Sequence, residues 1–530
     1  MIKKIKINSE DKLNNSLKLL VKSSILVLIG LLFSKIFTYF YRIIVARYFG
    51  IEVYGLFSLA LMILGWFVAF STLGLSEGIL RYIAVYRGKR ELEKIKHIFH
   101  FSLIILFFST IFSGIILFLA SEFISLKLFH NSNLIIFLKI FSVLIPLSVF
   151  SNIFLYIIKA YEQIGWYSFI LNIFQNAVKL FALGLFIFLG FKSNSIIYSY
   201  FVAIVLTLLF TYLFCKYKIS EIFGKSKLIK KDKDKISKEL LFYSFPVLFY
   251  EIMSNLFYWI DSFFLGFFKG VSEVGIYNVA VPIAALLTFT SYLFMQLFYP
   301  LINKEYSKKN FGLINELSKQ TGKWIFIINL PLFILMTLFP GVIINLLFGK
   351  EYLIAENSLR ILGIGVFISS MFHVFPHLLL MKGKSKLFLM DIIIVSIINI
   401  LLCFILIPKE NILFMNNSSG IIGAAIATTI STIFLNLLFL FQVKHYLSII
   451  PIRRKILRIL IVSVIPIGIL LYLKQFIQIN ILSLVLLGSF FIILYLFLIF
   501  ITGCLDKNDF MILKTFKKKI TAYNIKNFKK

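Results

Sequence analysis

Acidic residues are scarce in this chain. Only 23 aspartates and glutamates stand against 55 lysines and arginines in 530 residues, and charged residues of both signs make up 15% of the sequence. A soluble domain usually has about a quarter of its residues charged, so a large soluble protein is excluded. With 60% hydrophobic residues, the chain instead has the composition of a membrane protein.

Cysteines and catalytic motifs are scarce as well. Cys215, Cys403 and Cys504 lie in or beside apolar runs, without metal-ligand spacing, and nothing indicates a disulfide framework. We find no nucleotide-binding glycine motif and no nucleophile elbow. The predicted outer loops are also too short to hold a glycan as a membrane glycosyltransferase or polymerase does. We therefore expect no enzyme, no metal and no cofactor.

Long apolar runs fill most of the sequence. Runs of about 18 or more apolar residues predict transmembrane helices, which satisfy their own backbone hydrogen bonds in lipid. We expect fourteen, near residues 23–46, 54–80, 98–120, 134–158, 167–190, 195–215, 241–265, 275–301, 324–347, 357–381, 387–407, 420–443, 459–473 and 480–503. The first run lacks a small-residue cleavage pattern, so we interpret it as a retained helix.

The basic residues predict how these helices are oriented. Seven loops carry one lysine or arginine each: Arg47, Lys127, Lys192, Lys269, Lys350, Lys409 and Lys474. Most of the others lie in the alternate loops and at the two ends, and cytoplasmic segments are enriched in such residues. We expect a multi-pass protein of the cell (cytoplasmic) membrane with both termini cytoplasmic. This topology explains the basic excess without a nucleic-acid partner.

A glycine pattern recurs in the two halves of the chain. Gly50 and Gly55 return as Gly270 and Gly275, at one shared offset, and such glycines let the chain reverse tightly between helices. The repeat predicts an all-α polytopic fold of two pseudo-symmetric six-helix lobes plus two C-terminal helices. The expected parts are an N-terminal lobe (1–215), a basic cytoplasmic linker (216–240), a C-terminal lobe (241–450), and two further transmembrane helices with a basic cytoplasmic tail (451–530).

Several motifs resemble those of a known family. They are RYFG at 47–50, YGLFSLA at 54–60, LGLS at 73–76, LRY at 80–82 and GIIGAAIATT at 420–429. Together they are similar to Wzx-type polysaccharide biosynthesis or oligosaccharide flippases, which belong to the MOP exporter superfamily with MATE transporters and lipid II flippases. One departure is the segment 192–197. It stands where the first half should repeat the glycine-rich motif of residues 420–429, but it does not repeat it.

The resemblance implies a substrate and a process. It implies that an isoprenoid-diphosphate-linked oligosaccharide crosses the cytoplasmic membrane by alternating access, for the assembly of cell-surface polysaccharide or glycan. The implied partners are this lipid-linked oligosaccharide, membrane lipids and glycan-assembly enzymes.

Two cations in the first predicted helix are candidates for binding the diphosphate. Charged groups inside membrane helices are costly and therefore suggest function. Lys35 and Arg42 are seven residues apart, so they share one face of the helix, and both side chains suit phosphate. The alternative is that they snorkel toward an interface.

A polar stripe follows the fifth predicted helix. Its members are Asn172, Gln175, Asn176 and Lys179, whose spacing places all four on one side. We interpret the stripe as the lining of a substrate cavity. Hydrogen bonding between helices is the alternative.

Acidic groups in the seventh predicted helix are candidates for ion coupling. Glu251, Asn255 and Tyr258 share a face, with Asp261 slightly off it. Glu251 and Asp261 suit a coupling proton or cation, and a structural salt bridge is about equally expected. His373 and His377 are four residues apart, but without further ligands at fitting spacing we expect packed histidines rather than a metal site.

Two other transporter classes remain as alternatives. A MATE-type cation-coupled exporter of small organic molecules usually has twelve spans, so fourteen favours a flippase. A lipid II flippase shares the fourteen-span plan. The sequence leaves open the glycan, the lipid carrier, the energy source and the oligomeric state.

Overall fold

The computed structural model describes residues 2–409, 420–448, 453, 455–476 and 480–506. The regular elements of these residues are all helical. Thirteen described segments are long and apolar enough to cross a membrane. The first of them, Val27–Ser71, has 45 residues and is broken at Gly50, so it holds two crossings. The result is the fourteen crossings that hydropathy predicts.

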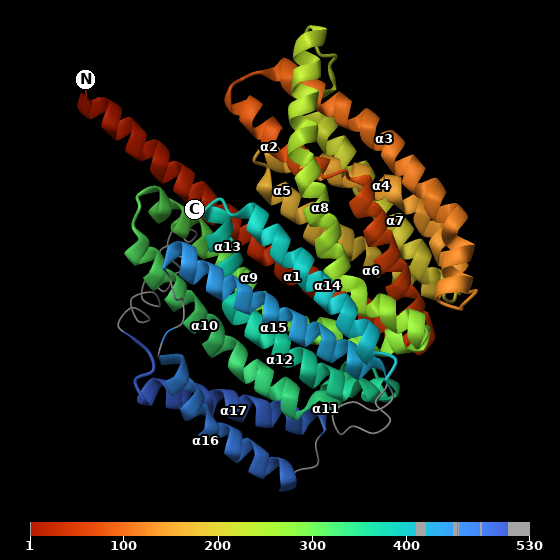
Figure 1. Cartoon of the computed structure of the whole chain (residues 1–530), viewed down its shortest axis with the longest axis vertical. Coiled ribbons are helices and arrows are strands. Elements are labelled where there is room, and N and C mark those ends of the chain that lie inside the picture. Colours follow the sequence, from red (N-terminus) through yellow and green to blue (C-terminus); the bar gives the residue numbers. More distant parts are fainter. Residues whose placement is uncertain (1, 410–419, 449–452, 454, 477–479, 507–530) are drawn as a thin grey trace.

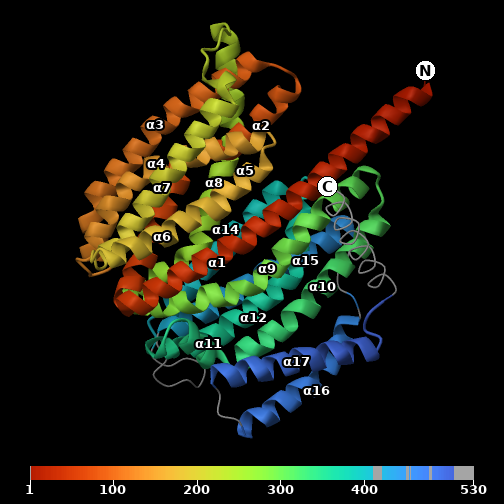
Figure 2. The same cartoon turned by 180° about the vertical axis from the view of Figure 1, so that it is seen from behind.

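The first part of the chain forms one group of helices, which we call the first lobe (Figure 1). It consists of α1 (Ile2–Ser71), α2 (Leu75–Gly88), α3 (Leu92–Phe123), η1 (Ile124–Leu128), α4 (Leu134–Ala160), α5 (Ile164–Ser168), η2 (Phe169–Phe174), α6 (Gln175–Phe188) and α7 (Asn194–Lys218). Figure 2 shows that α1 runs along the inner side of this group, next to α9 of the other group.

The second group begins after a long connection. A short η3 (Ser220–Phe223) precedes α8 (Lys230–Phe268). The second lobe then consists of α9 (Val271–Ser307), α10 (Phe311–Leu338), α11 (Pro340–Leu347), η4 (Lys350–Ala355), α12 (Glu356–Phe372), α13 (Val374–Met381), α14 (Ser385–Leu406) and α15 (Gly420–Leu447). Two further helices, α16 (Lys455–Phe476) and α17 (Ile481–Ile501), lie against the second lobe on the side away from the first (Figures 1 and 2).

Helix boundaries differ from the expectation at three places. α8 begins at Lys230, inside the segment 216–240 that the sequence suggested as a linker. Leu73 and Gly74 both have positive φ, 49° and 67°, which separates α1 from α2 within one crossing. Pro340 opens α11 because proline suits the first turn of a helix but interrupts its interior. The basic tail after residue 506 lies outside the described residues.

The repeated glycines have matching conformations. Gly50 has φ 82° and ψ −178°, and Gly270 has φ 94° and ψ 178°. This part of conformational space is open essentially to glycine alone. We call the end of the molecule with these two turns the Gly50 end, and the opposite end, where α8 begins, the Lys230 end.

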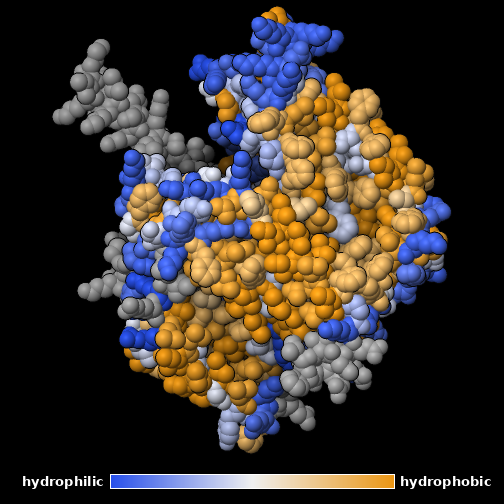
Figure 3. All heavy atoms as spheres, in the orientation of Figure 1, coloured by the Kyte–Doolittle hydropathy of each residue, from blue (hydrophilic) through white to orange (hydrophobic). Residues whose placement is uncertain are grey.

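The surface fits a chain surrounded by lipid. Large apolar side chains on the outside of the first lobe are widely exposed, such as Phe108 (67%) and Leu119 (72%). Figure 3 shows apolar side chains across the broad middle of the molecule, with hydrophilic ones gathered toward the ends of the helices. The described polypeptide is thus a multi-pass membrane protein.

Candidate substrate path at the lobe junction

The two lobes meet backbone to backbone at the Gly50 end. A Cβ atom on Gly55 would lie 2.1 Å from the Val271 carbonyl oxygen, and one on Gly275 would lie 2.3 Å from the Ile51 carbonyl oxygen. The second contact repeats the first with the lobes exchanged. The glycines that the sequence pairs therefore do more than turn the chain, because they also let the lobes touch.

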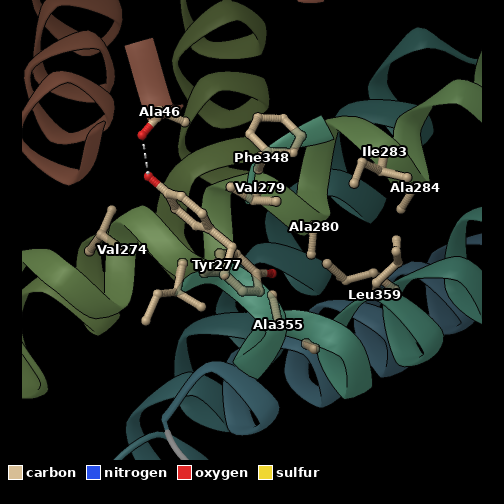
Figure 4. Close-up of a cluster of buried hydrophobic side chains, with 14 of the residues drawn as sticks. Ala46, Val274, Tyr277, Val279, Ala280, Ile283, Ala284, Phe348, Ala355 and Leu359 are labelled. Atoms are coloured by element: carbon tan, nitrogen blue, oxygen red, sulfur yellow. Dashed lines mark hydrogen bonds between the residues drawn. The ribbon is translucent and has the colours of Figure 1, made fainter. Parts of the chain in front are cut away.

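Side chains reinforce this closure. The Arg47 Nε and Nη2 atoms donate to the carbonyl oxygens of Leu347 and Asn345, each at 2.9 Å, at the end of α11. The Tyr352 hydroxyl donates to the Ala46 carbonyl oxygen at 3.1 Å, the bond drawn in Figure 4. Below it lies a buried apolar cluster from α9, η4 and α12. In this structure the Gly50 end is closed.

Helix α8 passes from one lobe to the other along its length. Near its start, the Tyr82 hydroxyl of α2 donates to the Glu239 carbonyl oxygen at 3.2 Å. A Cβ atom on Gly74 would lie 2.2 Å from the Ser244 carbonyl oxygen. Near its end, Asp261 accepts hydrogen bonds from α9 and α15. The middle of α8 therefore faces the junction between the lobes.

The two cations of α1 differ in their surroundings. Lys35 is exposed, and it has no hydrogen-bond or ion-pair partner among the described residues. Arg42 is half-buried and donates to the Tyr54 hydroxyl at 3.4 Å. Tyr54 in turn donates to the Asn278 carbonyl oxygen of α9 at 3.1 Å. Arg42 is thus tied to the contact between the lobes, whereas Lys35 is available to a ligand.

Tyrosine hydroxyl groups lie around Arg42. Tyr39 of α1 donates to the Pro282 carbonyl oxygen of α9. Tyr258 of α8 is 53% exposed and lies within electrostatic range of Arg42 and Tyr39. A guanidinium group beside accessible hydroxyl groups has further N–H donors that suit phosphate oxygens.

The acidic face of α8 meets the second half of α1. Glu251 Oε2 accepts a hydrogen bond from the Thr72 hydroxyl at 2.8 Å, and Asn255 Oδ1 would lie 3.5 Å from a Cβ atom on Gly65. Glu251 is therefore bonded across the junction to a hydroxyl group rather than to a cation of α1. This places one of the two candidate coupling acids at the junction.

Asp261 lies elsewhere, inside the second lobe. It is 4% exposed and accepts hydrogen bonds from the Tyr277 hydroxyl at 2.5 Å, the Thr428 hydroxyl at 3.2 Å and the Ser262 amide at 2.7 Å. Three donors satisfy much of what a buried carboxylate requires. The two candidate coupling acids are thus in different environments.

The stripe on the fifth predicted helix belongs to a helix contact. Asn176 donates to the Ser34 hydroxyl of α1 at 3.1 Å and accepts from the Thr38 hydroxyl at 3.3 Å. Asn172 is buried and donates to the Ser168 hydroxyl at 3.1 Å. In this structure these two amides therefore bond to neighbouring hydroxyl groups, and their contact with substrate stays a prediction. Periodicity identified the polar side of the helix but could not distinguish a cavity from α1.

Lys179, at the end of that stripe, is buried beneath aromatic rings. It is 9% exposed, and its ammonium group lies 4.6 Å from the centroid of the Tyr200 ring and 5.3 Å from that of Tyr41. Cation–π contacts of this kind stabilise a buried charge. In this structure Lys179 is thus packed inside the first lobe, and its contact with substrate stays a prediction. Gln175, the remaining member, is half-buried.

The histidine pair is packed against tyrosines. The ring centroids of His373 and His377 are 5.7 Å apart, and each histidine ring contacts one tyrosine of α9, Tyr292 or Tyr299. Over the described residues, no group of three or more histidine, cysteine, aspartate or glutamate side chains could hold a metal ion.

Two residues at the junction were missed by the sequence reasoning. Tyr54 links Arg42 to α9, and Thr72 links the turn between α1 and α2 to Glu251. Tyr54 stands inside a family-like motif, which was the available signal. Thr72 carried none, because hydroxyl groups in membrane helices usually bond to their own backbone.

The amino-acid sequence also matches known families. The family described as polysaccharide biosynthesis protein matches residues 20–305, which is more than half of the chain. The chain belongs to this family. A second family, described as MatE, matches residues 246–405, from within α8 to the end of α14.

Relatives of this polysaccharide biosynthesis protein occur in archaea and bacteria. It is 27% identical to an uncharacterized membrane protein of Methanocaldococcus jannaschii, over 71% of this chain and 74% of that protein. It is 23% identical to a putative O-antigen transporter of Shigella flexneri, over 73% and 89%. It is 25% identical to a probable low-salt glycan biosynthesis flippase of Haloferax volcanii, over 57% and 60%. The family is one of flippases and transporters, not of enzymes.

Solved structures share the fold. A lipid II flippase in its inward closed conformation gives a TM-score of 0.67 at 20% identity, over 89% of this chain and 98% of that one. An inward-facing MATE transporter for multidrug resistance, of the MOP superfamily, gives 0.61 at 16% identity, over 80% and 99%. The chain therefore shares the fold of these two transporters.

The family-like motifs lie where helices approach most closely. Gly55 and Gly74 stand at contacts with the other lobe and with α8, as described above. In the GIIGAA segment, a Cβ atom on Gly423 would lie 2.6 Å from the Leu406 carbonyl oxygen of α14. Small residues let membrane helices pack in this way, so these motifs identify the fold of the polysaccharide biosynthesis family more directly than its substrate.

Proposed function

We propose that this polysaccharide biosynthesis protein moves an isoprenoid-diphosphate-linked oligosaccharide across the cytoplasmic membrane for the assembly of cell-surface polysaccharide or glycan. Transport proceeds by alternating access, with both termini in the cytoplasm and the Lys230 end facing it. The observation that supports the proposal is a pair of cations, Lys35 and Arg42, on one face of α1, where Lys35 is exposed and Arg42 is tied to α9 through Tyr54.

The chemistry of the substrate fits this pair. A diphosphate needs cations in a site that lipid does not fill, and Lys35 supplies an exposed ammonium group. Arg42 adds a planar donor that is already oriented by Tyr54. The tyrosine hydroxyl groups nearby offer hydrogen bonds and apolar ring faces, which suit sugars.

Coupling to an ion or proton is assigned to Glu251 and Asp261. Glu251 bonds to Thr72 across the junction, so a change in its charge alters a bond between the lobes. Asp261 lies within the second lobe with three donors, where a bound cation would compete with those donors. Membrane lipids and glycan-assembly enzymes are the proposed partners.

The test is transbilayer movement in proteoliposomes. Purified protein is reconstituted, and flipping of an isoprenoid-diphosphate oligosaccharide is measured for the parent, Lys35→Ala, and Lys139→Ala as a matched control. Lys139 pairs with Glu122 at 2.8 Å on an exposed face of the first lobe. A charged hydrogen bond to phosphate contributes about 1.5–3 kcal/mol, so we expect Lys35→Ala to flip roughly tenfold to a hundredfold more slowly.

The outcomes separate the alternatives. A parent rate in Lys35→Ala, or an equal loss in Lys139→Ala, contradicts the assignment of the cation. If the protein flips lipid II but no lipid-linked oligosaccharide, the result favours the second candidate function, that of a lipid II flippase, which the overall fold similarity supports. Exchange of a small organic cation favours the MATE-type exporter, which the match over residues 246–405 supports.

A further inference from the structure

A cavity of about 720 Å³ lies at the Lys230 end, where the two lobes are bridged by α8. α8 and α14 converge toward the Gly50 end and splay apart toward the Lys230 end (Figure 1). The cavity is bounded by α2 of the first lobe, by α8, and by α13 and α14 of the second lobe. Its lining consists of Arg81, Tyr82, Glu239, Phe242, Tyr243, Pro246, Val247, Tyr250, Leu380, Ser385, Lys386, Phe388 and Leu389.

Most of this lining is apolar or aromatic, and its few charged groups are Arg81, Lys386 and Glu239. The Arg81 guanidinium carbon lies 4.3 Å from the centroid of the Tyr243 ring, a cation–π contact that holds the group in place. No carboxylate pairs with Arg81 or Lys386 within the described part of the chain. Their N–H donors can therefore serve a ligand.

The mouth of the cavity has the character of a lipid-facing surface. Phe242 is 86% exposed, and its neighbour Phe245, on the same helix, is 61% exposed. Exposed lysines lie close by in sequence, at the first turns of α8 and between α13 and α14. Apolar side chains below a basic rim are the pattern that attracts anionic lipid headgroups.

We propose that this cavity binds one anionic phospholipid from the leaflet at the Lys230 end. The phosphate lies between Arg81 and Lys386, and an acyl chain follows the aromatic wall of α8. Two cations and one acid leave a single positive charge, which complements a phosphodiester rather than a diphosphate. The site is separate from Lys35 and Arg42, which belong to α1.

The position of the cavity gives the lipid a regulatory role. Arg81 belongs to the first lobe and Lys386 to the second, so a lipid that contacts both has an affinity that depends on how the lobes are placed. A ligand that prefers one arrangement shifts the population toward it. Anionic lipid should therefore favour the arrangement with the Gly50 end closed, a consequence that rests on the proposed function, whereas binding itself does not.

The binding test uses the purified full chain and native mass spectrometry. Phosphatidylglycerol is the probe and phosphatidylcholine the neutral comparison. The double variant Arg81→Gln with Lys386→Gln should bind roughly tenfold less phosphatidylglycerol than the parent, with little change for phosphatidylcholine. The double variant Lys89→Gln with Lys216→Gln removes the same charge from exposed positions at the same end, outside the cavity and its rim, and should bind as the parent does.

A charge-retaining variant and a competing ligand complete the binding test. Arg81→Lys, with an unchanged melting temperature, should keep most of the binding, because it retains the charge. Absence of bound phosphatidylglycerol from the parent, or an equal loss in the control double variant, overturns the site. Displacement of the bound lipid by isoprenoid diphosphate at equal concentration also overturns it, because the cavity would then belong to the route of the substrate. All these measurements report lipid binding and do not depend on flipping activity.

Discussion

The two ends of the molecule hold the lobes together in different ways. At the Gly50 end the backbones touch through Gly55 and Gly275, where even a methyl group has no room, and Arg47 adds hydrogen bonds to α11. At the Lys230 end the lobes are connected through α8, with a cavity beside it. The first arrangement is a seal and the second leaves space, so the structure is that of a transporter closed at one end.

At the Lys230 end a cluster of charges joins the second lobe to the two C-terminal helices. Lys323 of α10 is fully buried and pairs at 3.1 Å with Asp506, which follows α17. Arg453 pairs with the same carboxylate at 2.9 Å, and so does Lys455. We call these four residues the Asp506 clasp. It fastens α10 to the segments around α16 and α17, so it stabilises the packing of these two helices on the second lobe and not the junction between the lobes.

The largest expected effect comes from breaking this clasp. Asp506→Asn removes the negative charge that faces the buried Lys323 as well as Arg453 and Lys455, and breaking a buried ion pair from one side costs about 3–5 kcal/mol. We expect a much lower melting temperature in detergent, measured by the unfolding of the purified protein. The exposed variant Glu122→Gln, which loses the pair with Lys139, should cost under about 1 kcal/mol. Equal effects of the two variants would contradict the role of the clasp.

Acid should weaken the same clasp. Partial burial alone would raise the pKa of Asp506, but hydrogen bonds from Lys455 and Lys323 and the charges of Lys323 and Arg453 outweigh it, so its pKa lies below the usual value. A carboxylate with a depressed pKa stabilises the fold at pH values above its unfolded pKa of about 3.9. That stability is lost as the pH falls through the folded pKa.

We therefore expect the melting-temperature difference between the parent and Asp506→Asn to be constant from pH 7 to about pH 5 and to shrink below about pH 4. Unfolding scans at several pH values check this. A difference that grows on acidification would contradict the sign of the pKa shift.

The seal at the Gly50 end should be sensitive to a single methyl group. A Cβ atom on Gly55 meets a backbone carbonyl group that cannot rotate away, and overpacking of this kind costs about 1–3 kcal/mol. Gly55→Ala should lower the melting temperature and increase the labelling of a cysteine placed nearby. Gly184→Ala is the matched control, because nothing lies within 4 Å of its added Cβ atom. If Gly55→Ala had as little effect as Gly184→Ala, the close contact at Gly55 would not be what closes the Gly50 end.

A smaller effect is expected from Arg47. Its side chain bonds to the last carbonyl oxygens of α11, and a cation at a helix C-terminus stabilises by about 0.3–1 kcal/mol, up to roughly 2 kcal/mol in partly buried sites. Arg47→Ala should open the Gly50 end more often, visible as faster cysteine labelling there. Lys127→Ala, an exposed basic residue at the same end, should leave the labelling rate unchanged.

The sequence predicted the crossings well because hydropathy is local. Apolar runs identified each transmembrane segment among the described residues, and the paired glycines identified the equivalent turns at Gly50 and Gly270. The passage of α8 from one lobe to the other was not predictable, because its contacts with Tyr82 and Asp261 join residues far apart in sequence. Local pattern gives no information about which face of a helix meets which neighbour.

The candidate site was predictable in part for the same reason. A lysine within an apolar run is a functional candidate by its charge alone, so the sequence suffices to name Lys35 as a candidate. Lys179 was equally conspicuous, yet its charge is met by two tyrosine rings. Whether a cation faces a cavity or an aromatic ring depends on tertiary packing, which residue spacing does not encode.

The most direct test of alternating access is a reversible lock at the Gly50 end. Ala46→Cys and Tyr352→Cys are joined by a short, reducible thiol crosslinker in proteoliposomes, with the buried native cysteines left in place. The account predicts that crosslinking stops the flipping of the lipid-linked oligosaccharide and that reduction restores it. Continued flipping by fully crosslinked protein would contradict the account, because the substrate would then cross without the Gly50 end opening.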